Sequence, residues 1–224
     1  MGKLIVIEGL DGSGKTTQFR LLQDRLKKSG LPHLAISFPD YESRSSELIK
    51  MYLSGEFGKD PKLVNPYAAS IFYAADRYAS YKKHWEGYYK SGGVVIASRY
   101  VTSNAVHQAS KLPEKDRKDY LDWLYDLEYN RIQIPKPDLV VFLDMPIDIS
   151  EKLMFARYKG DNSKKDIHER DKKYLKECRN AALFAAEYSG WDIVKCYCDD
   201  RPLEIEQISD VIFDKTLRVL KKGV

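Results

Sequence analysis

The sequence predicts an α/β fold with a parallel five-stranded sheet, helices on both faces and a short lid. Five short apolar runs are bounded by Gly, Pro or Asp, and longer helical patterns separate them. Strands that alternate with helices in this way are typical of a parallel sheet. The chain of 224 residues is long enough for one full core and contains no linker-like stretch, so we expect a single domain over residues 1–224.

The predicted strands are the apolar runs at Leu4–Ile7, His33–Phe38, Gly93–Ala97, Leu139–Leu143 and Asp192–Cys196. Helices are predicted at Lys15–Ser29, Ser45–Ser54, Asn65–Lys90, Ser103–Ala109, Arg117–Leu127, Ile149–Ala156, Arg170–Tyr188 and Leu203–Leu220. In an open parallel sheet, ligands bind at the carboxyl ends of the strands. The polar residues that follow the predicted strands are therefore the candidates for function.

The first strand runs directly into Gly9-x-x-x-x-Gly14-Lys15-Thr16, which is typical of a phosphate-binding loop over residues 9–17. Glycines let backbone N–H groups surround a polyphosphate, and the following helix adds the partial positive charge of its N-terminus. Lys15 can reach the β- and γ-phosphates, and the Thr16 hydroxyl can bind Mg²⁺. We predict that Mg-ATP, not a dinucleotide, is bound by Gly9, Gly12, Ser13, Gly14, Lys15, Thr16 and Thr17.

Charged residues also stand at the ends of two later strands. Asp144 follows the strand at Leu139–Leu143, where a carboxylate can hold magnesium through water; it could instead cap the next helix. Arg99 follows the strand at Gly93–Ala97, and its guanidinium can bind an oxyanion through two hydrogen bonds. Arg99 is therefore predicted to be a phosphate ligand.

Six segments in the same order and spacing resemble the thymidylate kinase family over nearly the whole chain. They are IVIEGLDGSGKTTQ near the start, Phe38-Pro39, IFYAADRY at Ile71–Tyr78, SRYVTSNAVHQ at Ser98–Gln108, PKPDLVVFLD at Pro135–Asp144 and DIHERDKKYL at Asp166–Leu175. The resemblance implies a P-loop nucleoside monophosphate kinase that transfers the γ-phosphoryl group of ATP to dTMP, with Mg²⁺ as cofactor. It also implies a homodimer.

The resemblance assigns roles residue by residue. Asp11 occupies the position that faces the sugar 3′-hydroxyl, Phe72 that of the aromatic ring stacked on thymine, and Arg77 that of the arginine bound to the base. Arg99 matches the arginine that holds the acceptor phosphate. The base pocket is expected to include Ser103, Asn104 and Gln108, and His107 stands where relatives carry an aromatic residue that disfavours a 2′-hydroxyl. A histidine with no role in binding is the alternative at His107.

The segment 157–169 resembles the lid that closes over ATP in this family. Gly12 stands where one subclass has arginine, and members without that arginine supply the positive charge from the lid. The candidates, any of which could instead be an ordinary solvated charge, are Arg157, Lys164, Lys165 and Arg170; Arg157 joins Lys15, Arg99 and Asp11 as a catalytic candidate. Asp166 and Glu169 match carboxylates of the lid.

Two positions depart from the family pattern. Ser98 replaces the usual aspartate before Arg99, so we expect a weaker or differently held metal, with Glu8 or Asp144 compensating through water. Asp40 stands where many relatives have an arginine near the acceptor phosphate, and Arg44 is the candidate replacement. A kinase for another pyrimidine nucleotide or a deoxynucleoside, or a catalytically weakened regulatory protein that binds nucleotides, therefore remains an alternative.

Composition limits the other functions. The formal charge of +4 is spread along the chain, which argues against a nucleic-acid surface. No apolar run is long enough to span a membrane and no export signal precedes the first strand, so we expect a cytoplasmic protein without a membrane partner. The three cysteines, Cys178, Cys196 and Cys198, are expected to be ordinary reduced thiols.

Overall fold

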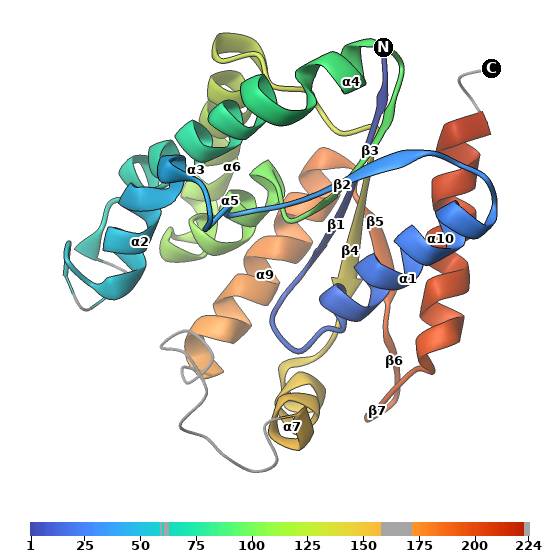
Figure 1. The fold of residues 1–224 in the computed structure, drawn as a ribbon. Coiled ribbons are helices and arrows are strands. Elements are labelled where there is room, and N and C mark those ends of the chain that lie inside the picture. Colours follow the sequence, from blue (N-terminus) through green and yellow to red (C-terminus); the bar gives the residue numbers. More distant parts are fainter. Residues whose placement is uncertain (59, 61–62, 158–171, 222–224) are drawn as a thin grey trace.

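The computed structural model describes residues 1–58, 60, 63–157 and 172–221, and its centre is a parallel sheet (Figure 1). The strands are β1 (Lys3–Gly9), β2 (His33–Ser37), β3 (Val94–Ser98), β4 (Leu139–Asp144) and β5 (Asp192–Lys195). They lie in the order β2-β3-β1-β4-β5, and each neighbouring pair is parallel. The predicted α/β fold is confirmed. Because β1 lies in the centre, the loop that follows it is flanked by the ends of β3 and β4.

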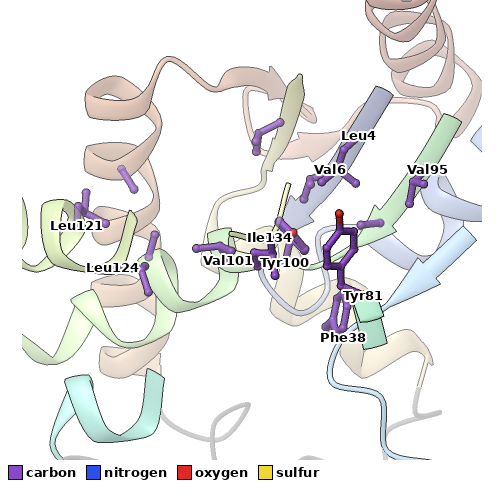
Figure 2. Packing of buried hydrophobic residues seen from close by; sticks show 14 of the residues in the cluster. Leu4, Val6, Phe38, Tyr81, Val95, Tyr100, Val101, Leu121, Leu124 and Ile134 are labelled. Carbon is purple, nitrogen blue, oxygen red and sulfur yellow. The ribbon is translucent and has the colours of Figure 1, made fainter. Parts of the chain in front are cut away.

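Side chains of β1 alternate between the two faces of the sheet, as the pleat of a strand requires. Leu4 and Val6 belong to one buried cluster, which also contains Val101 of α5 and Leu121 of α6 (Figure 2). Ile5 and Ile7 belong to a second cluster on the opposite face, against α1 and α10. Both faces are covered, which explains why the central strands are apolar without alternation.

The helices are α1 (Lys15–Lys28), α2 (Glu47–Ser54), α3 (Pro66–Ser80), α4 (Glu86–Lys90), α5 (Val101–His107), α6 (Glu114–Tyr125), α7 (Ile147–Arg157), α9 (Lys172–Ser189) and α10 (Ile205–Lys221). The helix predicted over 65–90 is divided by a π-helical turn at Tyr81–Trp85, and a second π-helical turn at Asp126–Arg131 follows α6. A short hairpin of β6 (Tyr197–Cys198) and β7 (Arg201–Pro202) was not predicted, because two residues a strand are too few for an alternating pattern.

The start of α3 has a local cause. The Asn65 side chain accepts a hydrogen bond of 2.8 Å from the backbone N–H of Tyr67, and Pro66 occupies the first helical position. Both residue types are preferred there, since an N-cap side chain satisfies an orphan N–H and proline has none to satisfy. None of the helices in the described part of the chain combines the length and apolar character that crossing a bilayer requires.

The three thiols differ in environment. Cys178 and Cys196 are buried, and burial raises the pKa of Cys178 to about 11 and that of Cys196 to about 12. Cys198 is exposed. Since the thiolate is the reactive form, we expect a thiol reagent to modify Cys198 alone in the native protein near neutral pH, and all three cysteines after denaturation.

The measurement is the stoichiometry of reaction with a chromogenic disulfide reagent, with Cys198→Ser as the matched variant. The variant should show no fast phase. A rapid second modification of the native wild-type protein would contradict the burial of Cys178 and Cys196.

Candidate active site

The phosphate loop turns sharply between β1 and α1. Gly12 and Gly14 have left-handed φ angles of 77° and 85°, which glycine adopts without strain. Lys15 is the first residue of α1 and is largely buried, while Thr16 next to it is exposed. A Cβ atom on Gly9 would lie 2.5 Å from the Ser13 Oγ, so a larger residue there would require the Ser13 side chain to turn away. This is the loop shape that the sequence predicted.

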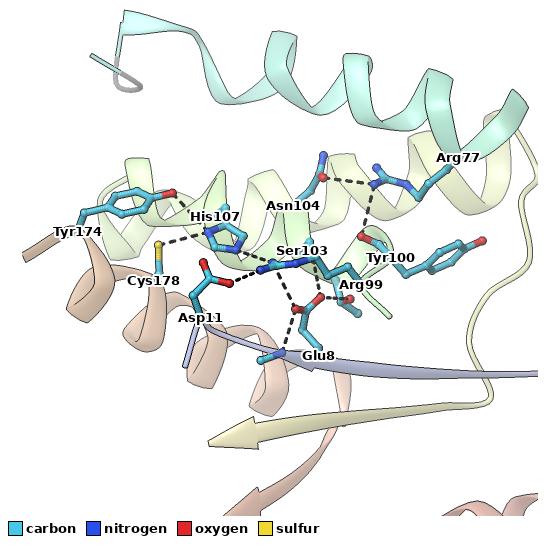
Figure 3. A network of polar contacts seen from close by, with 12 residues as sticks. Glu8, Asp11, Arg77, Arg99, Tyr100, Ser103, Asn104, His107, Tyr174 and Cys178 are labelled. Atoms are coloured by element: carbon cyan, nitrogen blue, oxygen red, sulfur yellow. Dashed lines mark hydrogen bonds and ion pairs between the residues drawn. The ribbon is translucent and has the colours of Figure 1, made fainter. Parts of the chain in front are cut away.

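Arg99 follows β3 at the edge of this loop and connects three polar groups (Figure 3). Its Nη2 donates to Asp11 Oδ1 at 2.8 Å, and its Nη1 lies 3.0 Å from His107 Nε2. Nη1 also lies 3.9 Å from Glu8 Oε1. Burial alone would lower the pKa of Arg99. The negative charges of Asp11 and Glu8 outweigh this effect, so the pKa of Arg99 lies above its usual value. Arg99 is therefore a permanent cation beside the phosphate loop.

Glu8 is fully buried beneath Arg99 and is held by hydrogen bonds. Its Oε2 accepts from the hydroxyls of Thr102 and Ser103, each at 2.7 Å, and its Oε1 accepts from the Gly9 N–H at 2.9 Å. Ser103 borders the cavity described next, as predicted, but its hydroxyl proton points to Glu8. The carboxylate predicted to act on a metal through water thus holds β1 and α5 together.

A cavity of about 220 Å³ opens beside Arg99. Seven of the eight residues predicted to bind the acceptor line it: Asp11, Arg77, Arg99, Ser103, Asn104, His107 and Gln108. They come from the phosphate loop, from α3 and from the stretch around α5. Phe38 and Pro39, from the predicted Phe38-Pro39 step, also line it. The fold thus brings residues that are far apart in the sequence, from Asp11 to Gln108, to one cavity next to the phosphate loop.

Phe72 is the exception, and the structure corrects its assignment. Its ring lies 5.6 Å from that of Phe57 and packs against the small cluster of Tyr52, Val64 and Ala69, outside the residues that line the cavity. The aromatic ring of α3 that lines the cavity with Arg77 is Tyr73. Helical spacing could have indicated this, because residues four apart share a face and residues five apart do not.

Arg77 is fixed by a partner that sequence analysis missed. It is fully buried and forms an ion pair with Glu128, whose Oε2 lies 3.3 Å from Arg77 Nε. Arg77 Nη1 also donates to Asn104 Oδ1 and to the Tyr100 carbonyl, both at 3.4 Å. Glu128 lies in the π-helical turn after α6 and is itself fully buried. The pair holds the Arg77 guanidinium at the wall of the cavity.

Asp144 is also paired. Arg179 of α9 donates to both of its carboxylate oxygens, Nε to Oδ1 at 2.7 Å and Nη2 to Oδ2 at 2.9 Å. Asp144 was predicted either to hold magnesium through water or to cap α7, and Arg179 was not among the predicted site residues. The structure shows instead a two-bond ion pair between β4 and α9.

Comparisons with known proteins identify the family of this chain. The family model described as thymidylate kinase matches residues 7–199. The chain belongs to the thymidylate kinase family. The thymidylate kinase of Mycobacterium tuberculosis is 31% identical over 190 residues, 84% of this chain and 87% of the relative. That of Schizosaccharomyces pombe is 29% identical over 222 residues, covering 98% and 97%. The solved thymidylate kinase of Candida albicans superposes with a TM-score of 0.70 at 23% identity, covers 97% of this chain and 93% of its own, and confirms the fold.

The lid expected of a thymidylate kinase falls largely outside the described residues. Arg157 is the last residue of α7. The other lid candidates, Lys164, Lys165, Asp166, Glu169 and Arg170, belong to the stretch 158–171, which lies beyond the described part of the chain. Their roles stay predictions.

The two departures from the thymidylate kinase pattern can be placed. Ser98 ends β3 directly before Arg99 and is half-buried. Asp40 uses its backbone N–H to donate to Asp76 at 2.9 Å, and Arg44 is exposed in a 3₁₀ turn outside the cavity lining. Arg44 therefore does not supply the cation predicted there; among the described residues that line the cavity, the arginines are Arg77 and Arg99.

Proposed function

We propose that this protein is a thymidylate kinase that transfers the γ-phosphoryl group of ATP to dTMP, giving dTDP and ADP. Family membership supports the reaction class, and the observation that carries the proposal is the position of Arg99. Its guanidinium binds Asp11 of the phosphate loop and also lines the cavity. A cation at this junction can bind the acceptor phosphate next to the donor phosphates, as an in-line transfer requires.

The phosphate loop binds the phosphate donor in this proposal, and the cavity binds the acceptor. The loop N–H groups, Lys15 and the N-terminus of α1 bind the ATP phosphates. Arg99 binds the dTMP phosphate and directs one of its oxygens at the γ-phosphorus. A phosphate monoester is largely deprotonated at neutral pH, so its oxygen attacks without help from a general base. Asp11, beside Arg99, is placed to accept a hydrogen bond from the sugar 3′-hydroxyl.

The base is proposed to bind deeper in the same cavity. Tyr73 supplies a flat ring for stacking, and Arg77 supplies fixed N–H donors for a base carbonyl. Gln108 is almost fully buried, and its Oε1 has no hydrogen-bond partner among the described residues. An unpartnered buried acceptor of this kind can bind an N–H group on the edge of a pyrimidine.

The site fits a magnesium ion that enters with ATP. The Thr16 hydroxyl is exposed at the start of α1, beside the loop that would hold the phosphates. Glu8 and Asp144 are already bound to Thr102, Ser103 and Arg179, so we propose that Thr16 and the nucleotide's own oxygens are the main ligands. When bound, the ion would supply positive charge beside the phosphates, which offsets the negative charge of the group in transfer.

A pairing of two copies through α3 is proposed from the family and from the helix surface. Ile71 and Tyr78 are exposed and stand seven residues apart, so they form one apolar stripe along α3. Light scattering of the wild type and of Ile71→Lys tests this, because a charge in the stripe should yield monomers. A wild-type protein that is monomeric at all concentrations would contradict the pairing.

The test of function is ADP formation from Mg-ATP with dTMP, dUMP, dCMP, CMP and thymidine offered singly to the purified protein. We expect the highest kcat/KM with dTMP. Preference for another nucleotide or for thymidine would support phosphoryl transfer but would show that dTMP is not the main acceptor. ATP binding without turnover on any of the five would instead favour a regulatory role.

Tyr73 and Phe72 provide a matched pair for the base pocket. Tyr73→Leu removes the ring that lines the cavity, and we expect the KM for dTMP to rise by about tenfold while the KM for ATP stays unchanged. Phe72→Leu, one residue away and outside the cavity lining, should leave both constants close to wild type. Steady-state kinetics with each substrate varied in turn measures both KM values. A raised KM for dTMP in Phe72→Leu but not in Tyr73→Leu would show that Phe72, and not Tyr73, contacts the base.

A further inference from the structure

His107 lies between Arg99 and α9 and contacts both (Figure 3). Its Nε2 is 3.0 Å from Arg99 Nη1. Its Nδ1 is 3.4 Å from the Tyr174 hydroxyl and 3.6 Å from Cys178 Sγ. The His107 and Tyr174 rings are stacked at 23° with centroids 6.4 Å apart. The imidazole therefore touches the proposed phosphate-binding arginine with one nitrogen and α9 with the other.

Hydrogen-bond chemistry determines which tautomer this arrangement needs. Arginine has donors only, so His107 Nε2 must accept the bond and carry no proton. A neutral imidazole then has its proton on Nδ1, which faces the oxygen of Tyr174 and the sulfur of Cys178. Cys178 donates its own hydrogen to Ser110 Oγ at 3.4 Å, which leaves the sulfur able to accept. The contacts from α9 are thus compatible with the tautomer that Arg99 requires.

The bond from His107 completes the support of Arg99. One terminal nitrogen of the guanidinium is held by Asp11 and the other by His107. Together they fix the rotation of the guanidinium plane, and bidentate binding of a phosphate depends on that rotation. We propose that His107, as the neutral Nδ1–H tautomer, is a positioning residue that orients Arg99 toward the acceptor phosphate. This inference rests on the function proposed above.

Protonation of His107 would remove this support. The described groups that face the ring or contact Arg99 include the charged Arg99, Asp11 and Glu8, and the Tyr174 and Cys178 side chains of α9. Burial raises the pKa values of Tyr174 and Cys178, so both are neutral near pH 7. An imidazolium has no acceptor for Arg99 and would stand beside it as a second cation. A protonated His107 would therefore leave Arg99 without this orienting bond, and the KM for dTMP would rise.

Two substitutions distinguish the contribution of the His107 hydrogen-bond acceptor from that of its flat ring. His107→Phe keeps a flat ring against Tyr174 but cannot accept from Arg99. His107→Gln loses the ring, but its side-chain oxygen can accept near the position of Nε2. We expect the KM for dTMP to rise about tenfold in His107→Phe, with the KM for ATP unchanged, and to stay within about threefold of wild type in His107→Gln.

The pH profile separates positioning from a purely structural role. The second ionisation of the dTMP phosphate, with a pKa near ~6, affects every variant equally. We therefore expect the ratio of the dTMP KM of His107→Phe to that of the wild type to exceed one where the imidazole is neutral and to fall towards one where the imidazolium forms. A ratio of one at all pH values would overturn the proposal.

Nitrogen NMR tests the tautomer without any substrate. The chain has four histidines, and the His107 signals are those lost from the spectrum of His107→Phe. In the wild type above neutral pH we expect a protonated Nδ1 and an unprotonated Nε2; the opposite tautomer would overturn the proposal. If the protein phosphorylates an acceptor other than dTMP, this spectrum is unaffected, and the KM ratios are measured with that acceptor. A failure of the proposed function can therefore be distinguished from a failure of the proposed role of His107.

Discussion

Lys15→Ala is expected to reduce kcat for ADP formation with dTMP by about 10³-fold while leaving the fold intact. Lys15 begins α1 at the turn of the phosphate loop, where its ammonium can reach the β- and γ-phosphates. The loop N–H groups remain in the variant, but they cannot replace a full positive charge on the group in transfer. Alanine is the best helix former, so α1 should persist.

The control for Lys15 is Lys27→Ala, at an exposed position near the other end of the same helix. It removes the same charge from α1 and should leave kcat close to wild type. Circular dichroism and urea unfolding of both variants would show that the folds are equal. Undiminished turnover in Lys15→Ala would remove the argument that Gly9–Thr17 binds the donor phosphates.

Glu128→Ala is expected to lower the free energy of unfolding by about 3–5 kcal/mol, because it leaves the Arg77 guanidinium buried without its counter-charge. The comparison is Asp126→Ala, two residues away in the same π-helical turn. Asp126 pairs with Arg131 at 2.8 Å in an exposed position, and its loss should lower the free energy of unfolding much less than the loss of Glu128 does. Urea unfolding of the two variants measures the difference, and equal losses would show that burial of the Arg77–Glu128 pair does not matter.

A double substitution separates stability from recognition in this pair. Arg77→Met with Glu128→Leu replaces both charges by apolar groups, and such exchanges of a buried ion pair are often neutral or stabilising. We expect the double variant to recover most of the stability lost in Glu128→Ala. Its KM for dTMP should nevertheless be higher than that of the wild type, because the donors of Arg77 at the cavity wall are gone. Recovery of both properties would show that Arg77 has no part in binding the base.

The sequence was sufficient for features that depend on local pattern. The strands of the sheet are short apolar runs with helices between them, and the loop at Gly9 has a fixed spacing of glycine, lysine and threonine. Because parallel strands end at one edge of the sheet, Asp11, Arg99 and the residues of α5 could be expected near each other. Asp11, Arg99 and the predicted residues of α5 do line one cavity, and Phe72 does not; their roles in binding the acceptor stay predictions.

Features that depend on pairing across the chain could not be predicted. Glu128 is 51 residues from Arg77, and Arg179 is 35 residues from Asp144, so no helical or strand spacing links them. A carboxylate just after a predicted helix is normally a solvated charge, and only the folded chain shows that Glu128, in the π-helical turn after α6, is buried against Arg77. Tyr73 could have been predicted, because its four-residue spacing from Arg77 is visible in the sequence. The family resemblance of the segment IFYAADRY instead assigned the stacking role to the neighbouring Phe72.

The close packing at Gly12 limits how this active site could change during evolution. A Cβ atom at residue 12 would lie 2.8 Å from the Ser150 carbonyl oxygen and 2.9 Å from Met154 Cγ, both in α7. The carbonyl belongs to the helix backbone and cannot move aside alone. A single mutation to arginine at this position would therefore meet α7 before its charge could reach a phosphate. A side chain at residue 12 would need further substitutions that shift α7, so in this chain one substitution at Gly12 alone does not bring a new charge to the phosphates.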